Sequence, residues 1–444
     1  MPTFVDLAGV PLVTVKSACL NQPAATPAPA PKKSKRSRRA PLKPQPKTQV
    51  TAAQQRFWAD PSIAPKKDQL WMLPVCIKSG GAKPFCQILS EKEQVLPVAG
   101  CSPWVFANGS AAGYYRTQYD KADLQKLIAV AGTELTTAER IMFLRDEAAL
   151  VTSGQENMAT YLDLVASVSQ DAQNSVVASY ASSLDFIDSY LLQDNNANAF
   201  RAWVRSNFQP MMAKVGWTPT ANENADTHSL RSTLIAILGD IGEDPETIRQ
   251  STRLAEQYLK SPDSVDASIA GDVLRVAARN GNEALFEQYV SAMPQMHSPE
   301  QFYNLARALA DFRDPKIVER VLAMSVSDEV RSQDAAGLIS AVLRNPDNQK
   351  TAWAWVKANW PAVEKKTTMS SGSRIVSATG SFCSLELRDD VQSFFTEHKV
   401  PSAERTLKQS LEDIEACTRR RPRMETQFSE WLQQHPATSS AQAK

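Results

Sequence analysis

The spacing of apolar residues changes its period once along the chain, near residue 120, and this change sets the strongest limit on the fold. Before that point, short β-branched and aromatic runs separated by turn signals are typical of half-buried strands. The expected strands are residues 10–16, 55–58, 70–78, 85–89, 104–106 and 114–119. After that point, apolar residues recur with the period of a helix, and Thr136-Thr-Ala-Glu139 is a capping box that predicts a helix start. We therefore predict a multidomain protein, with a small β-sandwich over residues 1–119 and an α-helical domain over residues 120–436.

Turn signals recur through the helical part at a nearly constant spacing. Asp244-Pro245, Asn280-Gly281, Asp314-Pro315 and Asn345-Pro346 follow one another at intervals of roughly 31 to 37 residues, which is the length of one helix hairpin. Repeats of this kind bury their apolar faces by stacking on their neighbours. The helical domain is therefore predicted to be an irregular α-solenoid of the HEAT/armadillo type, and the small polar residues 437–444 are predicted to form a flexible tail.

An insertion at about residues 21–47 separates the first two expected strands and is rich in Pro, Ala, Lys and Arg. It has too little apolar surface to offset the entropy cost of ordering, so we expect a disordered loop. Its basic run at residues 32–39 resembles a nucleic-acid-binding patch. Nucleic-acid binding is nevertheless the less favoured interpretation, because no aromatic residue lies among the basic ones and the net charge of the chain is only +1.

Motifs that carry catalysis in other proteins are missing from the sequence. The histidines are His228, His297, His398 and His435. No two of them lie within one helical turn, as the ligands of an H-E-x-x-H zinc motif would. The sequence also lacks a G-x-S-x-G elbow, a phosphate loop and a dinucleotide fingerprint. We expect no catalytic residue, cofactor or metal ligand in this chain, and we expect its carboxylates to be solvated on helix faces.

No membrane span and no export signal are expected. The longest apolar run falls short of the roughly 18 residues that a membrane-spanning helix needs. Residues 1–15 have no basic segment and are interrupted by Pro2, Asp6 and Pro11, so they are predicted to lead into a strand and not to form a signal peptide.

Several segments resemble, in order, the C-terminal region of aminopeptidase N-like zinc metallopeptidases. This family of gluzincin aminopeptidases includes the endoplasmic-reticulum and puromycin-sensitive aminopeptidases. The similar segments are residues 9–15, 54–57, 70–74, 104–116, 136–150, 216–231, 353–360 and 394–404. Residues 136–150 depart in part from the family's D-R-x-x-L-x-D-D-x-x-L helix, since this chain has Glu139-Arg140 and Arg145-Asp146 there. The family's H-E-x-x-H and G-A-M-E-N motifs do not occur in the sequence.

The resemblance implies a non-catalytic C-terminal portion that caps the peptide cavity of a catalytic domain absent from this chain, as in a split or truncated enzyme. It implies no activity for the chain alone, with zinc only in the missing domain, and its expected partners are peptides and a separately encoded catalytic domain. The alternative is a free-standing helical-repeat scaffold that binds peptides or proteins.

Two expectations about binding surfaces depend on this resemblance. Arg374 precedes a helix similar to one in the family, and a guanidinium group suits a peptide carboxylate, so Arg374 is the candidate peptide contact. A surface that faces a catalytic domain should expose apolar side chains. We therefore expect an apolar or mixed patch on the concave side of the helical array and along one edge of the sandwich.

The cysteines fall into two groups, four in the first quarter of the chain and two near its C-terminus. The even number in each group suggests disulfides within each domain, although buried free thiols in a cytosolic protein remain the alternative. Cys76 and Cys86 would lie on adjacent strands around Gly80-Gly81, close enough to form a disulfide. Cys383 and Cys417 lie at the ends of helices that resemble those of the family. The expected pairs are Cys76–Cys86, Cys19–Cys101 and Cys383–Cys417. Disulfides would favour a periplasmic or extracellular origin.

Overall fold

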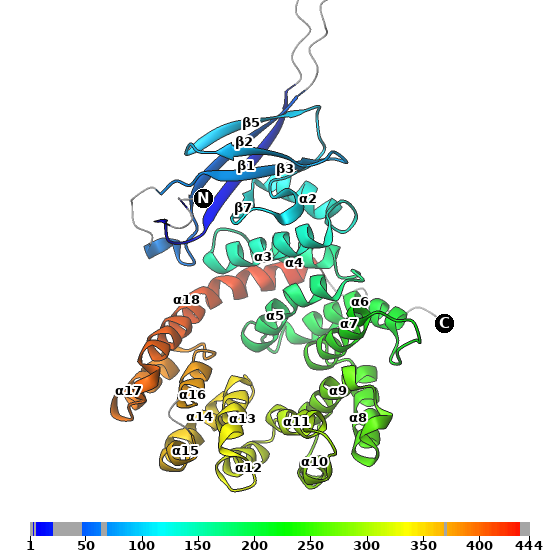
Figure 1. Cartoon of the computed structure of the whole chain (residues 1–444), viewed down its shortest axis with the longest axis vertical. Coiled ribbons are helices and arrows are strands. Elements are labelled where there is room, and N and C mark those ends of the chain that lie inside the picture. Colours follow the sequence, from blue (N-terminus) through cyan, green and yellow to red (C-terminus); the bar gives the residue numbers. More distant parts are fainter. Residues whose placement is uncertain (1–2, 4–5, 21–46, 64–68, 368–370, 436–444) are drawn as a thin grey trace, which may run out of the picture. The chain divides into compact units, whose positions relative to one another are not determined.

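The structure is a computed structural model, and it divides into two compact units (Figure 1). It describes residue 3 and residues 6–20, 47–63, 69–367 and 371–435. The first unit comprises residues 1–156 and 160–168, and the second comprises residues 157–159 and 169–444. Most of the expected basic insertion, with its run at residues 32–39, and the expected tail lie outside the described residues.

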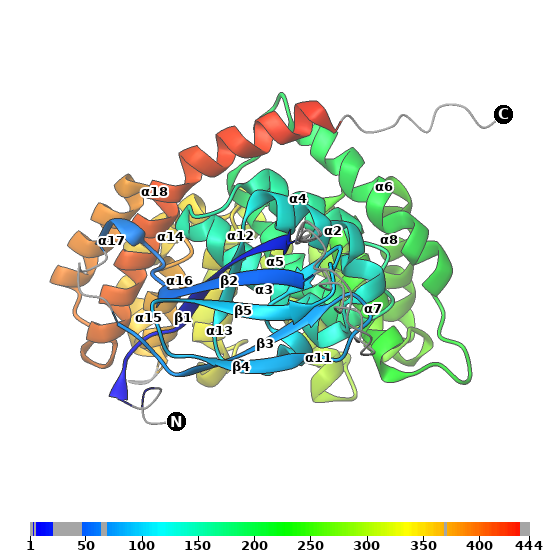
Figure 2. The same ribbon diagram turned by 90° about the horizontal axis from the view of Figure 1, so that it is seen from above.

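The first unit contains two β-sheets, which confirms the predicted β-then-α fold class. One sheet has the order β5-β2-β1-β7 and the other β4-β3-β6 (Figure 2). The strands are β1 (Pro11–Leu20), β2 (Lys47–Arg56), β3 (Leu73–Ser79), β4 (Phe85–Leu89), β5 (Glu93–Ala99), β6 (Val105–Phe106) and β7 (Arg116–Tyr119). Side chains along β2 alternate between buried and more exposed, as the period of a strand requires. Buried Gln54 at the end of this strand donates to the carbonyl of Trp71 at 2.9 Å and accepts from its amide at 2.8 Å.

Strand β5 was not among the expected strands. It pairs with β2 alone among the described strands and so lies at the edge of its sheet. Its polar start at Glu93-Gln94 and the proline at position 97 hide the strand pattern in the sequence. An edge strand tolerates this proline, because one side of the strand needs no ladder hydrogen bonds.

In the described residues, three α-helices belong to the same compact unit as the strands: α2 (Lys121–Glu134), α3 (Thr137–Ser153) and most of α4 (Met158–Ser167). Helix α3 begins at the predicted capping box, in which Glu139 accepts from the amide of Thr136 at 2.8 Å. Glu139 also accepts from the Lys78 ammonium at 2.7 Å and the Ser110 amide at 2.8 Å. Asp146 accepts from the amide of Thr117 at 2.8 Å. Buried carboxylates thus fix α3 to the strands, and the compact units divide near residue 168, beyond the change of period at residue 120.

The second unit is a two-layer helical array. Helices of the first layer contact one another in chain order and follow a curve in Figure 1. This layer contains α5 (Asn174–Tyr190), α7 (Ala225–Ala236), α9 (Ala267–Arg279), α11 (Pro299–Ala308), α13 (Ser332–Arg344), α16 (Gly372–Thr379) and α18 (Glu404–Gln434). The other helices are α6 (Ala197–Val215), α8 (Pro245–Lys260), α10 (Glu283–Ala292), α12 (Pro315–Val326), α14 (Gln349–Ala358), α15 (Trp360–Lys366) and α17 (Leu385–Glu397). All of these except α15 contact a helix of the first layer directly.

Aromatic side chains fill the core near the end of the array. Trp353 and Trp360 are buried, and their rings lie 5.2 Å and 5.3 Å from the ring of Phe394 in edge-on contacts. Trp217 and Trp355 are only half-buried. These four tryptophans therefore contribute to helix packing to different extents.

The two ends of the curved array contact each other. The amide of Gln349 in α14 donates to the hydroxyl of Tyr190 in α5 at 3.1 Å, and this hydroxyl donates to the carbonyl of Ser381. The side-chain amide of Asn196, just before α6, donates to Ser429 in α18 at 3.3 Å. The array therefore closes on itself, unlike an open solenoid.

The described cysteines form three disulfides. They join Cys19 to Cys101, Cys76 to Cys86 and Cys383 to Cys417, the pairs expected from the sequence. The second bridge links β3 to β4, and the third links Cys383, two residues before the start of α17, to Cys417 in α18. Within the described part of the chain, no helix combines the length and apolarity that crossing a bilayer would require.

Candidate functional site

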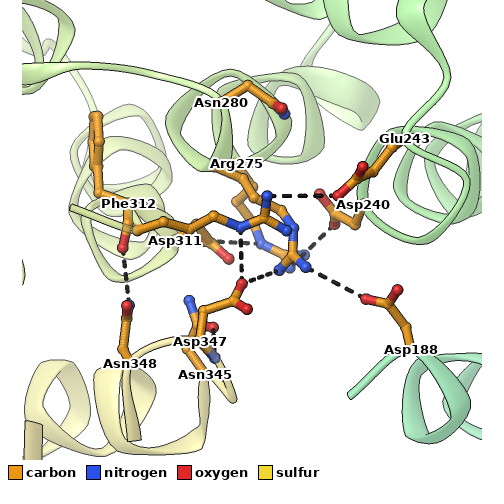
Figure 3. Close-up of polar contacts among 12 residues, drawn as sticks. Asp188, Asp240, Glu243, Arg275, Asn280, Asp311, Phe312, Asn345, Asp347 and Asn348 are labelled. Atoms are coloured by element: carbon orange, nitrogen blue, oxygen red, sulfur yellow. Dashed lines mark hydrogen bonds and ion pairs between the residues drawn. The ribbon is translucent and has the colours of Figure 1, made fainter. Parts of the chain in front are cut away.

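The turns predicted between helical repeats lie beside one another in the second unit. Asp244 and Asp314 cap α8 and α12, with a proline at the first helical position in each case. The side-chain amide of Asn345, after α13, donates to the carbonyl of Ala310 at 3.0 Å, which ties neighbouring turns together. Ionisable side chains converge around these turns (Figure 3). We call them the turn ladder, which consists of Asp185, Asp188, Arg201, Asp240, Glu243, Asp272, Arg275, Arg279, Asp311, Arg313 and Asp347.

Two arginines of the ladder connect turns that are distant in the sequence. Arg313 lies 2.8 Å from Asp347 and 3.6 Å from Glu243. Arg279 lies 3.3 Å from Asp347 and 3.4 Å from Asp188. These ion pairs link α5, the turn before α8, the end of α9 and the turn before α14.

Arg275 in α9 lies among three carboxylates. Its guanidinium group is 3.2 Å from Asp311, 3.6 Å from Asp272 and 3.7 Å from Asp240. These charges, Asp311 first, raise the pKa of Arg275 above its ordinary value. Burial nevertheless raises the pKa of Asp240 to about 7, although Arg275 opposes this shift. One oxygen of Asp240 is buried and has no hydrogen-bond partner.

The backbone that presents Asp240 is irregular. Residues Ile237–Ile241 form a π-helical turn, η3, at the end of α7, and Glu243 has a positive φ of 40°. A Cβ atom at Gly239 would lie 2.6 Å from Val276, so glycine lets this turn approach α9 closely. Such irregularities cost free energy and are enriched at functional sites, which makes the ladder a candidate site.

A pocket of about 450 Å³ adjoins the ladder. Asp185, Asp240, Asp272 and Arg275 line it together with small and apolar residues of α5 and α7. Carboxylates were expected on solvated helix faces, and this expectation was wrong for Glu139, Asp146 and Glu147, all buried in α3. In the ladder, Asp185 and Asp347 are exposed and the other carboxylates are half-buried. Sequence alone could not reveal these positions, because the side chains meet only when repeats stack.

A larger pocket of about 680 Å³ contains the candidate residue Arg374. Helices α11, α13 and α16 form it, and Met293, Phe302, Val330 and Leu338 contribute apolar walls. Three guanidinium groups line it, and no ion pair or hydrogen bond joins any of them to another described residue. They belong to Arg307, Arg331 and Arg374. Arg307 lies over the ring of Tyr303, 5.9 Å from its centroid.

The first unit exposes an apolar sheet face. Pro74 of β3 pairs with Ile88 of β4, and Cys76 pairs with Cys86, so these residues share one face. Met72, Ile88, Phe85 and Val95 are among the large apolar side chains that are at least 40% exposed. The helical unit has one comparable described residue, Leu385, at 49%. Ile88 and Phe85 lie on opposite faces of β4, and Val95 belongs to the other sheet, so the apolar patch expected on the helical array and the sandwich edge stays a prediction.

The histidines occupy separate positions. His398 stacks on Phe394 with 4.3 Å between ring centroids, and His435 stacks on Trp431 at 4.7 Å. His228 lies 3.5 Å from Glu223, which also pairs with buried Arg231 at 2.7 Å. Across residues 6–20, 47–63, 69–367 and 371–435, no three His, Cys, Asp or Glu side chains converge as a metal site.

The segments that carry the family resemblance have packing roles. Arg231 is fully buried and donates to both oxygens of Glu223 and to the carbonyl of Gly216 at 2.8 Å. This clamp explains the shared pattern at residues 216–231. A Cβ atom at Gly113 would lie 2.0 Å from the ring of Tyr115, whose hydroxyl donates to Ala107 at 2.6 Å. These residues hold the loops of each unit by buried hydrogen bonds and close packing.

A small β-sheet unit followed by a two-layer array of helix hairpins is the class of protein that the fold and its packing motifs define. The family model described as the ERAP1-like C-terminal domain matches residues 104–416, which is more than half of the chain. The chain belongs to this family, which confirms the resemblance seen in the sequence.

Curated relatives agree with this assignment. Aminopeptidase M1 of Arabidopsis thaliana is 27% identical over 78% of this chain and 42% of its own length. Aminopeptidase 2 of Candida albicans is 22% identical over 88% of this chain and 43% of its own length. Endoplasmic reticulum aminopeptidase 2 of Bos taurus is 24% identical over 78% of this chain and 37% of its own length. The chain therefore spans about two fifths of the length of these relatives.

Proposed function

We propose that this chain is the non-catalytic C-terminal part of an aminopeptidase N-like zinc peptidase and that it holds peptides next to a catalytic domain outside this chain. The family assignment and the names of its relatives support the enzyme class. Zinc and the reacting groups then belong to that catalytic domain. The observation that carries peptide holding is the pocket lined by three arginines without described ion-pair partners.

The chemistry of this pocket suits a peptide end. Apolar walls from Phe302 and Leu338 offer room for an apolar side chain, and Arg374 offers a guanidinium group for the carboxylate. Two acidic side chains, Glu329 and Asp334, also line the pocket beside the three arginines. Asp334 accepts from the hydroxyl of Tyr303 at 3.2 Å, so it is engaged within the wall. A ligand with one negative charge next to an apolar group complements this arrangement.

Fluorescence anisotropy of a labelled peptide that ends in leucine tests this proposal. Binding of the free acid should exceed binding of the C-terminal amide, and Arg374→Gln with Arg331→Gln should weaken it. One charge-assisted hydrogen bond contributes about 1.5–3 kcal/mol, which is roughly 10- to 100-fold in affinity. The matched control is Arg249→Gln, an exposed arginine of α8. Equal binding of acid and amide, or unchanged binding by the double variant, would contradict this use of the pocket.

The exposed face of the β3–β4 sheet is the surface that we assign to the catalytic domain. The curated relatives extend well beyond the region that they share with this chain. A catalytic domain is therefore the partner that we assign to this surface. Met72 and Ile88 lie on this face, opposite buried neighbours such as Leu73 and Leu89. Substituting them therefore removes no side chain from the sandwich core.

Sedimentation velocity of the purified chain examines this surface. The exposed apolar face should cause self-association, and Met72→Glu with Ile88→Glu should reduce it without lowering the thermal midpoint. Lys83→Glu, at an exposed position near β4, is the control. A monodisperse chain that these substitutions leave unchanged would argue against a docking surface. Peptide binding without such a surface would favour a free-standing scaffold.

A further inference from the structure

Helix α13 forms one wall of the proposed peptide pocket and has two different faces. One face packs into the helical unit with buried apolar side chains, which belong to Ala335, Ala336, Ile339, Val342 and Leu343. The other face lines the pocket with Asp334, Gly337, Leu338 and Ala341. These four positions follow the spacing of one side of a helix. The pocket wall is therefore a regular helix face with a glycine at its middle.

Neither the backbone nor the packing of α13 requires this glycine. Gly337 lies in the interior of the helix, where glycine is less favourable than alanine, and its φ is not positive. Among the described residues, no atom lies within 4 Å of the place that a Cβ atom would occupy at Gly337. Gly239 differs, because a Cβ atom there would lie 2.6 Å from Val276. A role in the fold thus explains Gly239 but not Gly337.

The open space beside Gly337 belongs to the pocket. Its volume of about 680 Å³ is in the range of ligand-binding sites. Phe302 and Ala306 of α11 also line this space, and α11 and α13 contact each other. Phe302, Ala306 and Gly337 are all half-exposed, so the two helices do not close over the pocket. A side chain at position 337 would take up volume that the pocket now offers to a ligand.

The surroundings of Gly337 define what could fill this volume. Met293, Phe302, Val330 and Leu338 give the pocket its apolar walls, whereas Arg374 offers a guanidinium group to a carboxylate. An apolar side chain next to the carboxylate of a peptide suits both features. A larger side chain removes more apolar surface from water, provided that the wall leaves room for it.

We propose that Gly337 determines the size of the apolar side chain that the pocket accepts. Its missing side chain leaves room for a large aromatic or branched residue at the carboxylate end of a peptide. This inference rests on the proposed peptide-binding function and adds the ligand class and the residue that selects it. Helix stability is lower with glycine at this position, and the gain is selectivity for large side chains.

Fluorescence anisotropy with two labelled peptides tests this inference on the 444-residue chain. The peptides differ only in their last residue, which is phenylalanine or alanine. Wild-type protein should bind the phenylalanine peptide at least about tenfold more tightly, since apolar pockets discriminate by this factor or more per methylene group. Gly337→Leu should reduce the preference to less than about threefold, and Gly337→Ala should give an intermediate ratio.

Two controls separate selectivity from stability. Gly337→Ala introduces a better helix former, so its thermal midpoint should not fall below that of the wild type. Gly271→Ala in α9 is the matched control, because Gly271 is also a half-buried helical glycine and does not line the pocket. A Cβ atom at Gly271 would make an ordinary contact with Asn304 at 3.4 Å. This variant should keep the wild-type ratio of affinities.

The outcomes distinguish this inference from the function on which it rests. If the wild type shows no size preference, or if both Gly337 variants keep the wild-type ratio, the role of Gly337 is overturned. The peptide pocket itself still stands in that case when the free acid binds more tightly than the C-terminal amide. Equal binding of acid and amide by the wild type would overturn the proposed function and this inference together.

Discussion

Two carboxylates, a buried one in the first unit and a half-buried one in the second, behave in opposite ways. Glu139 in the first unit accepts from Lys78 at 2.7 Å and from two backbone amides at 2.8 Å. Burial opposes its ionisation, yet these donors lower its pKa below the ordinary value. Asp240 in the second unit has Arg275 at 3.7 Å and one buried oxygen without a partner, and its pKa rises to about 7. The donors that surround a buried carboxylate decide whether it stays charged.

This difference matches what each carboxylate does for the fold. Glu139 joins the start of α3 to β3 and to the loop at Ser110, so its charge is a fixed part of the first unit. Asp240 belongs to a network in which each repeat contributes further acids to the same place. Glu139, with its lowered pKa, stays charged near neutral pH, whereas Asp240, with a pKa of about 7, changes its charge there.

The largest effect on stability is expected for Lys78→Met. This change leaves buried Glu139 without its cation, and such losses cost about 3–5 kcal/mol. The free energy of unfolding near pH 7, from urea denaturation, should fall by this amount. The loss should shrink in acid, because the stability due to a carboxylate with a lowered pKa disappears as the pH falls through that pKa. Lys83→Met is the matched control at an exposed position, and an equal loss in that variant would contradict the role of Lys78.

A smaller effect of opposite sign is expected for Glu147→Gln. Glu147 is 1% exposed, neither of its oxygens has a hydrogen-bond partner, and burial raises its pKa well above the ordinary value. Its ionisation therefore destabilises the fold as the pH rises above about 4.5. The glutamine variant should gain about 1 kcal/mol at pH 8 and nothing near pH 4, measured by urea denaturation at both values. A gain that is the same at both pH values would show that packing and not charge is responsible.

The smallest effect is expected for Glu246→Gln in the exposed pair with Arg249. Water and salt screen such a pair, so the free energy of unfolding should change by less than about 0.5 kcal/mol at any pH. Together, the three substitutions separate a fixed buried charge, a neutral buried acid and a solvated charge. A large effect of Glu246→Gln would mean that burial does not explain the difference between the three substitutions.

Local signals in the sequence predicted local structure well. The capping box at Thr136 begins α3, and Asp-Pro signals at positions 244 and 314 begin α8 and α12. Each signal acts within one turn of the chain, because a cap or a proline acts on backbone groups next to it. The order of strands and helices, and so the fold class, followed from such signals and from apolar spacing.

Features that depend on packing between distant residues were not predicted. Arg279 and Asp188 are separated by 91 positions in sequence and meet only because α5 and α9 lie in one layer. Asp240, Asp311 and Glu147 look like solvated helix residues in the sequence, since a helix pattern does not show which polar face a neighbour covers. Arg374 was singled out by resemblance alone, and its pocket depends on how α11, α13 and α16 pack.

The contact between the two ends of the helical array limits how its length can evolve. An open solenoid gains or loses repeats at little cost, because each repeat touches only its neighbours. Here Asn196, just before α6, contacts Ser429 in α18, so deleting or duplicating one hairpin would separate the residues that join the ends. We expect insertions to be tolerated in the loops between helices, whereas the number of hairpins stays fixed. The array should also unfold as one cooperative block, with no free end from which repeats could unwind one at a time.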